Sequence, residues 1–180
     1  MASFTERIVG AARLDVKTYE EVEADQSAFS QAMAVVVLSA LAAGIGASMR
    51  LGLRGLIGMT IVSLVAWFIW AALTWVVGTK LMPEPTTHAD LGQMLRTIGF
   101  AASPGLASIL GIIPVLGWIV PFIVWVWSIA AMVVAVRQAL DYSSTGRAFA
   151  VCLIGWVVNV VITFMMLPII GLGSMMSGGY

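Results

Sequence analysis

The chain has 180 residues, of which 61% are hydrophobic and only 10% are charged, and its mean hydropathy is +1.02. A soluble domain carries about 25% charged residues, so this composition excludes an ordinary water-soluble globular protein. The nine basic and nine acidic side chains give a formal net charge of zero, which leaves no basic field to favour a nucleic-acid partner.

The first 28 residues form a polar segment that carries six acidic and three basic side chains. A signal peptide instead has a basic start followed by an apolar core. Apolar residues recur at spacings of three and four, and Ser3–Glu6 and Thr18–Glu21 match capping boxes, which predicts two short helices. We expect residues 1–28 to lie as amphipathic helices on the cytosolic membrane surface. A solvated helical segment without a partner is the alternative.

Long uncharged runs define a membrane domain over residues 29–171. A helix needs about 20 apolar residues to cross about 30 Å of hydrocarbon. Four runs of this length or longer lie between or beyond the charged residues. The first, second and last run each hold one predicted span, at 30–48, 56–78 and 149–170, and the last is followed by a flexible Gly/Ser-rich tail at 172–180.

The third run contains 40 uncharged residues between Arg96 and Arg137. As a single helix it would be roughly 60 Å long, about two bilayer thicknesses. Glycines and prolines interrupt its middle, which predicts a hairpin of two spans at 103–115 and 118–140. Because the first arm is short, a re-entrant segment that does not cross the membrane is the alternative.

The distribution of basic residues favours five spans over four. With five spans and a cytosolic amino terminus, only Arg50 and Arg54 of the nine basic residues face outward. With four spans, Arg137 and Arg147 also change sides. The positive-inside rule therefore predicts an all-α polytopic helical bundle of about five spanning helices plus short interfacial helices, with its carboxyl terminus outside.

Polar residues beside the spans are the candidate contact sites. Arg137 and Asp141 are spaced i, i+4 at the end of a predicted span, so they can form an ion pair. The polar turn after them is either an ordinary anchored loop or a contact surface for lipid headgroups or a partner protein. Residues 90–102 predict an interfacial helix that leads into a proline. The candidates for partner or lipid contact are Asp90, Arg96, Pro104, Arg137, Asp141, Tyr142 and Arg147.

Within the predicted spans, Asn159 is the most polar deep residue. We interpret its amide as an interhelical packing contact, with a ligand or pore contact as the alternative. The chain has one histidine, one cysteine and no phosphate-binding loop, and we expect no paired carboxylates to face a common cavity, so we predict no catalytic, metal-binding or cofactor-binding residues. No charge lies near a span centre, which argues against a proton-coupled transporter but not against a passive pore.

Three stretches carry a family resemblance: LDVKTYEEVE at 14–23, DLGQMLRTIGFAASP at 90–104 and VRQALDYSSTGRA at 136–148. In this order and placement they resemble the Yip family of Ypt-interacting membrane proteins, above all its bacterial members. The resemblance implies five spans, a cytosolic amino terminus, a bacterial inner membrane location and no known catalysis. Eukaryotic members are associated with Rab-type GTPases, a partner that the bacterial setting does not offer.

We therefore predict a non-enzymatic membrane protein that acts as an organiser, scaffold or trafficking-like factor. Its expected partners are the lipid bilayer and either a second copy of itself or another membrane protein. Two alternatives remain open, namely a small passive permease or channel and an accessory subunit of a larger membrane complex.

Overall fold

The computed structural model describes residues 2–46, 52–113, 115–158 and 161. Most of these residues are helical and none of them lies in a strand, which confirms the expected all-α class. The elements in chain order are α1 (Phe4–Ala12), α2 (Val16–Ala24), α3 (Ala28–Gly46), α4 (Gly52–Val76), the π-helix η2 (Val77–Leu81), α5 (Leu91–Phe100), the 3-10 helix η3 (Ser103–Ile112) and α6 (Ile119–Ala139), followed by a helix at Thr145–Val158.

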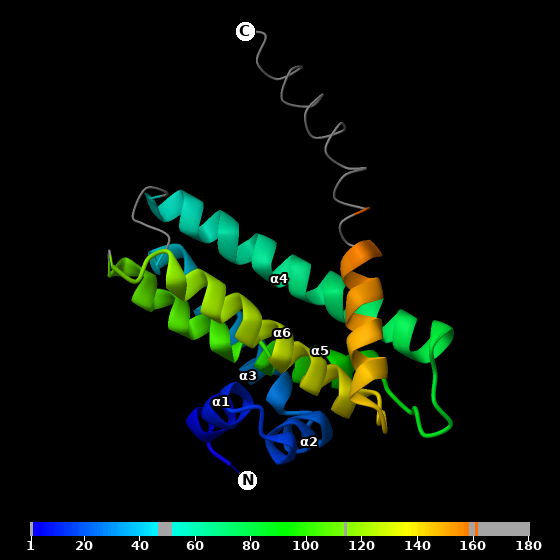
Figure 1. Cartoon of the computed structure of the whole chain (residues 1–180). Helices are drawn as coiled ribbons and strands as arrows, with labels where there is room; N and C mark the ends of the chain where they lie inside the picture. Colours follow the sequence, from blue (N-terminus) through cyan, green and yellow to red (C-terminus); the bar gives the residue numbers. More distant parts are fainter. Residues whose placement is uncertain (1, 47–51, 114, 159–160, 162–180) are drawn as a thin grey trace, which may run out of the picture.

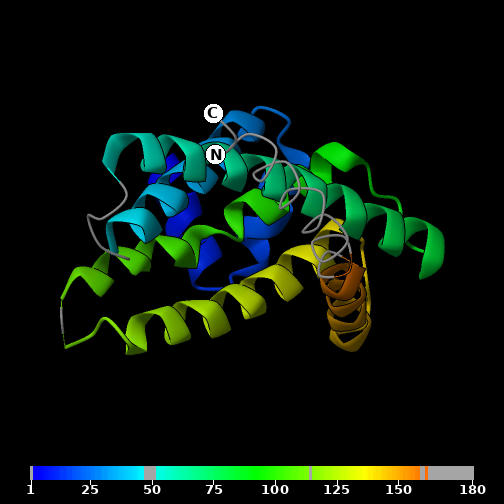
Figure 2. The same cartoon turned by 90° about the horizontal axis from the view of Figure 1, so that it is seen from above.

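The long helices pack into one bundle with the two short amino-terminal helices on one side of it (Figure 1). Within the bundle, α3 contacts α4, α5 and η3, and α6 contacts α5 and η3. Helices α1 and α2 lie against α5, and α2 also contacts α6. Figure 2, which is seen from above, shows α4 and α6 on opposite flanks of this arrangement.

Four stretches are long and apolar enough to cross a membrane. They are Ala28–Ile45, Ser63–Leu81, Leu91–Ile112 and Ile119–Ala139. Large apolar side chains such as Ile61, Val65 and Phe68 remain exposed along α4, and surface of this kind is stable when lipid covers it. The helix Thr145–Val158 is also apolar, but most of the predicted span 149–170 lies outside the described residues.

The stretch Leu91–Ile112 differs in construction from the span predicted at 103–115. It joins α5, which was expected to be an interfacial helix, to the 3-10 helix η3. An α-helix rises about 1.5 Å per residue and a 3-10 helix about 2.0 Å. The ten residues of each element therefore give about 35 Å together, enough for the ~30 Å hydrocarbon core.

The break between α5 and η3 is satisfied by serine hydroxyls. Ser103 Oγ donates to the carbonyl of Phe100 at 2.6 Å, and Ser39 Oγ on α3 donates to the carbonyl of Ala102 at 2.7 Å. These bonds matter because an unpaired carbonyl is costly in a medium without water. Pro104 follows in the first turn of η3, where its missing N–H group leaves no bond unmade.

Of the two capping boxes predicted for the amino-terminal helices, the structure confirms one. The capping box of Ser3 and Glu6 is confirmed. The box predicted at Thr18–Glu21 is wrong, because α2 already begins at Val16 with Asp15 as its N-cap. Thr18 Oγ1 instead donates to the Asp15 carboxylate at 2.8 Å. The left-handed turn at Leu14, with φ of 63°, starts the second helix earlier than the sequence pattern indicated.

Candidate functional site

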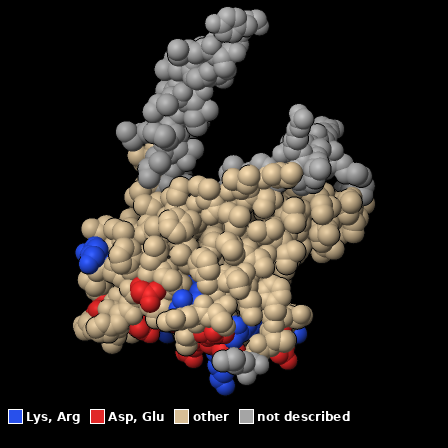
Figure 3. All heavy atoms as spheres, turned by 180° about the vertical axis from the view of Figure 1, so that it is seen from behind, with Lys and Arg blue, Asp and Glu red and all other residues tan. Residues whose placement is uncertain are grey.

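The charged side chains lie mainly along the lower side of the molecule in Figure 3, where Figure 1 places α1 and α2. We call this region the charged side and define it as α1, α2 and the connecting segments 82–90 and 140–147. Most of the residues predicted as contact sites lie here, so its internal bonds decide which of them are available to a partner.

Glu84 joins the two connecting segments of the charged side. One carboxylate oxygen accepts hydrogen bonds from the backbone N–H of Ser143 at 3.0 Å and from its hydroxyl at 2.9 Å. The other forms an ion pair with Arg147 Nε at 3.2 Å. The Ser143 backbone N–H is the main cause that lowers the pKa of Glu84. The carboxylate therefore stays ionised at neutral pH and holds the two segments together.

Tyr142 also stabilises the contact between the two connecting segments. Its side chain is buried, and its hydroxyl lies 3.0 Å from the carbonyl of Gly78 and 2.7 Å from that of Met82. Burial is the main cause that raises the pKa of this phenol. Tyr142 is therefore a structural residue that ties the segment 140–147 to the end of η2.

The carboxyl end of α6 reverses the chain. Asp141 adopts a left-handed backbone with φ of 52°, which lets the N–H of Tyr142 donate to the carbonyl of Arg137 at 2.9 Å. The Arg137 guanidinium then donates to the carbonyls of Tyr142 and Ser143 at 3.2 and 3.4 Å. Across the described ranges the predicted Arg137–Asp141 ion pair is not formed, because the turn offers the guanidinium these carbonyls instead.

A polar hollow of about 440 Å³ lies beside this turn. The predicted contact residues Arg137, Asp141 and Tyr142 are together in its wall. Thr86, in the segment 82–90, also lines the hollow and donates a hydrogen bond to the carbonyl of Asp141 at 3.0 Å. The lining is completed by Gln138 and Ser143. Two of its six lining side chains, Arg137 and Asp141, are charged, and two more, Thr86 and Ser143, are aliphatic alcohols. This hollow therefore suits a polar group at the membrane boundary better than an acyl chain.

Arg96 lies inside the bundle and is only 7% exposed. Its Nε donates to the carbonyls of Val22 and Glu23 at 3.0 and 3.1 Å, and its Nη2 also bonds the Glu23 carbonyl. These carbonyls belong to the last turn of α2, where carbonyls lack helical partners and the helix dipole is negative. Arg96 therefore caps α2 rather than facing a partner.

Glu23 lies at the same junction. Gln93 Nε2 on α5 donates to its carboxylate at 3.0 Å. Burial, followed by the negative charge of Asp141, raises the pKa of Glu23 to about 7, although Arg96 opposes this shift. The Glu23 carboxyl group therefore loses its proton at a higher pH than an ordinary glutamate.

A second buried arginine was not among the predicted site residues. Arg7 is 2% exposed and forms ion pairs with Glu21 at 2.8 Å and with Asp25 at 2.7 Å. It also donates to the Gln31 side chain on α3 at 3.0 Å. The sequence does contain a signal for this site, because Glu21 and Asp25 are spaced i, i+4 and therefore lie on the same side at the end of α2.

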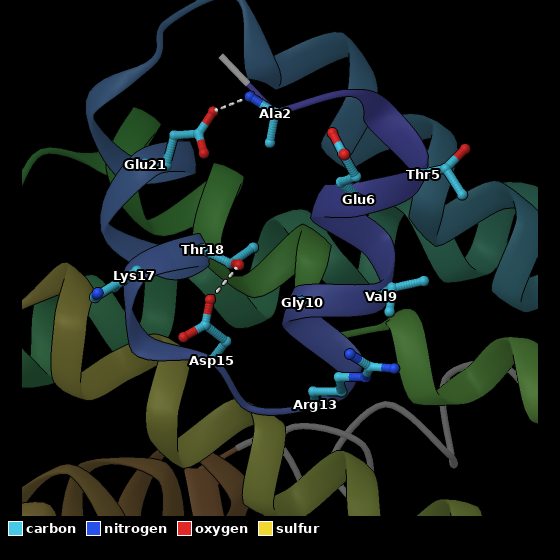
Figure 4. Close-up of a pocket in the computed structure, with 10 residues that line it drawn as sticks. All are labelled: Ala2, Thr5, Glu6, Val9, Gly10, Arg13, Asp15, Lys17, Thr18 and Glu21. Carbon is cyan, nitrogen blue, oxygen red and sulfur yellow. Dashed lines mark hydrogen bonds between the residues drawn. The ribbon is translucent and has the colours of Figure 1, made fainter.

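The two amino-terminal helices also flank an open groove of about 540 Å³ (Figure 4). Gly10 allows this close approach, because a Cβ atom there would lie 2.1 Å from Thr18 Oγ1. Acidic and basic side chains share the rim, as Glu6, Arg13 and Lys17 show. The mixture favours neither an anionic nor a cationic ligand.

Of the other predicted site residues, two have structural roles and one lies outside the described residues. Asp90 caps α5, where its carboxylate accepts from the Gln93 backbone N–H at 2.8 Å. Pro104 is fully buried, and Asn159 lies outside the described residues. Within the described part of the chain, no group of three or more metal-ligating side chains is present.

Comparison with known proteins gives one family match. The model of the family described as "Yip1 domain" matches residues 16–167. No curated protein and no solved structure matches the chain. The matched range covers α2, the bundle and the segment 140–147, so it includes the charged side except for α1.

Proposed function

The chain belongs to the Yip1 domain family, and from this premise we propose that it is a non-enzymatic membrane organiser or scaffold that acts through its charged side. The family is not known for catalysis, and the helical bundle is that of a multi-pass membrane protein. The observation that carries the proposal is the bonding of Glu84 to both Ser143 and Arg147. It gives the polar segments a fixed shape that a partner can recognise.

The proposed orientation places this charged side in the cytosol of a bacterial cell, with five spans in the inner membrane and the carboxyl terminus outside. The positive-inside rule supports this orientation, because Lys17, Lys80, Arg137 and Arg147 then all lie on the cytosolic side. The four candidate spans account for four of these crossings, and the proposed fifth, at 149–170, begins in the apolar helix Thr145–Val158.

Photo-crosslinking in the native membrane tests the scaffold proposal. A photoreactive residue at Ser144, which is exposed in the segment 140–147, should give a discrete protein adduct. The same residue at Trp125, which is 61% exposed on the apolar surface of α6, is the matched control and should give lipid adducts. A purified monomer without any Ser144 adduct, which also leaves vesicle shape unchanged, would contradict the proposal.

The same experiment separates a scaffold from an accessory subunit. An adduct between two copies of the chain, or with several proteins, supports the organiser. A single different partner recovered at fixed stoichiometry supports the subunit instead. The passive-permease alternative was based on the broken segment 104–121. The carbonyls at the break before Pro104 accept hydrogen bonds from Ser103 and Ser39 inside the bundle. These bonds favour a structural role for the break over a pore lining.

A further inference from the structure

The polar hollow of about 440 Å³ lies where two candidate spans end. The span Ser63–Leu81 is followed by the segment 82–90, which supplies Thr86, and α6 ends at Ala139 just before the turn that supplies Asp141. Figure 1 shows the segment 82–90 at the outer edge of the bundle. Lipid headgroups lie at the ends of membrane spans, so the hollow is at the depth of the headgroups of the surrounding bilayer.

The hollow holds one cation and one anion that do not pair with each other. Arg137 and Asp141 both line it, but the left-handed turn at Asp141 directs the guanidinium to two backbone carbonyls. A guanidinium has five N–H groups, so three of them remain after the bonds to Tyr142 and Ser143. In the part of the chain that the structure describes, Asp141 forms hydrogen bonds through its backbone alone, which leaves its carboxylate unpaired.

The acceptors of the hollow suit a primary ammonium group. Gln138 donates its amide N–H to Glu20 at 3.1 Å, so its amide oxygen is left as an acceptor. With the Asp141 carboxylate it offers acceptors to an ammonium, which has three N–H donors. A quaternary ammonium has no N–H group and is instead recognised by aromatic cages, whereas the aromatic side chain among the described lining residues, Tyr142, is buried.

We propose that this hollow binds the headgroup of a zwitterionic phospholipid that ends in a primary ammonium, with the phosphate on Arg137 and the ammonium on Asp141 and Gln138. The separated charges of the hollow match the two charges of such a headgroup. An anionic phospholipid fits less well, because it offers no ammonium to Asp141 and because the nearby Glu20 carboxylate repels added negative charge. The proposal goes beyond the scaffold role and needs no protein partner, so lipid binding and crosslinking at Ser144 can fail independently.

Lipid titration of the full-length protein in detergent micelles, read by native mass spectrometry, tests this assignment. Dioleoyl phosphatidylethanolamine and dioleoyl phosphatidylcholine are matched probes, because they differ only in the methylation of the ammonium. The first should bind about tenfold more tightly, since it alone can donate hydrogen bonds to the Asp141 carboxylate. Dioleoyl phosphatidylglycerol should also bind more weakly than phosphatidylethanolamine. Equal affinities for phosphatidylethanolamine and phosphatidylcholine would overturn the proposal.

Two variants locate the two charges of the headgroup. Asp141→Asn removes the carboxylate but keeps the left-handed turn, because asparagine also tolerates this backbone. It should reduce the preference for phosphatidylethanolamine over phosphatidylcholine to about twofold or less. Arg137→Gln should weaken the binding of both lipids about tenfold, whereas Arg13→Gln makes the same change of charge at an exposed position outside the hollow and should weaken neither. An unchanged preference in Asp141→Asn would overturn the proposal.

A last measurement separates a bilayer lipid from a soluble zwitterion of the same chemistry. Glycerophosphoethanolamine carries the same two charges without acyl chains. It should displace phosphatidylethanolamine only at a roughly hundredfold higher concentration, because acyl chains hold the lipid headgroup beside the hollow at a high effective concentration. Displacement at an equal concentration would assign the hollow to a soluble ligand and overturn the lipid assignment.

Discussion

At the scale of single residues, two buried guanidinium groups explain how a polar segment is fixed to an apolar bundle. Arg7 neutralises two carboxylates and reaches α3, while Arg96 satisfies the last carbonyls of α2. Burying a charge is unfavourable unless it is paired and hydrogen-bonded. Each arginine therefore makes the helix packing specific, because moving the amino-terminal helices away would break the bonds that satisfy its charge.

Replacing Arg7 tests this reasoning. Arg7→Met keeps an unbranched side chain but leaves Glu21 and Asp25 without their cation. We expect the free energy of unfolding, measured by denaturant titration in mixed micelles, to fall by about 2–3 kcal/mol; the partial exposure of Glu21 keeps the loss from being larger. The matched change Arg13→Met at an exposed site should stay within about 0.5 kcal/mol. Equal effects of the two changes would contradict the role of Arg7.

The hydroxyl of Tyr142 offers a second test. Tyr142→Phe removes the group that bonds the carbonyls of Gly78 and Met82 and leaves the ring in place. Leaving buried carbonyls unsatisfied should lower stability by about 1–2 kcal/mol. Ser144→Ala in the same segment is the control and should have little effect. Unchanged thermal unfolding of Tyr142→Phe would show that the segment 140–147 is held by other contacts.

At the scale of elements, the contact between α3 and the third candidate span is set by small residues. Gly99 on α5 faces Ala32 on α3, and a Cβ atom at Gly99 would lie 2.7 Å from the Ala32 Cβ. Gly105 on η3 faces Ser39 in the same way, with a corresponding distance of 3.0 Å. Helices in lipid commonly associate through close approach at small residues, because the hydrophobic effect does not drive them together there.

Enlarging Gly99 should separate these two helices. Gly99→Ala forces backbone movement, because part of the clash is with the Ala32 backbone at 3.2 Å, and should cost about 1–3 kcal/mol of unfolding free energy. Gly146→Ala is the matched control, since its Cβ atom would meet only Ser144 Oγ at an ordinary 3.6 Å. If both variants unfold like the parent, the α3–α5 contact is looser than the structure indicates.

At the scale of the whole molecule, the separation of charge from apolar surface orients the protein in the membrane. Candidate spans carry exposed apolar side chains, whereas charged groups gather along the side formed by α1, α2 and the two connecting segments (Figure 3). Lipid can cover the first surface and water the second. The segments 82–90 and 140–147, bonded through Glu84, must then lie on the same side of the bilayer.

Cysteine labelling tests this arrangement in a Cys152→Ser background. Cysteines at Val16 and Ser144 should both react with a membrane-impermeant maleimide in inside-out vesicles and not in intact cells. A cysteine at Ser177, which lies outside the described residues, should react from the opposite side if the five-span prediction holds. Labelling of positions 16 and 144 from different sides would contradict the structure itself.

The sequence alone determined the membrane setting, the helical class and the family, since each depends on composition, run length or local motif. The long uncharged runs require lipid, and the three motif stretches led to the family that the matched range 16–167 confirms. The Ser3–Glu6 cap was also predictable, because a capping box involves only residues within one turn.

Only the tertiary structure decided which polar residues are structural. Arg96 was expected on a contact surface, but residues more than 70 positions away supply its carbonyl acceptors. Arg137 was expected to pair with Asp141, but a left-handed turn redirected it to Tyr142 and Ser143. Local spacing cannot reveal such partners, because the free energy that fixes a buried charge comes from groups that only chain folding brings together.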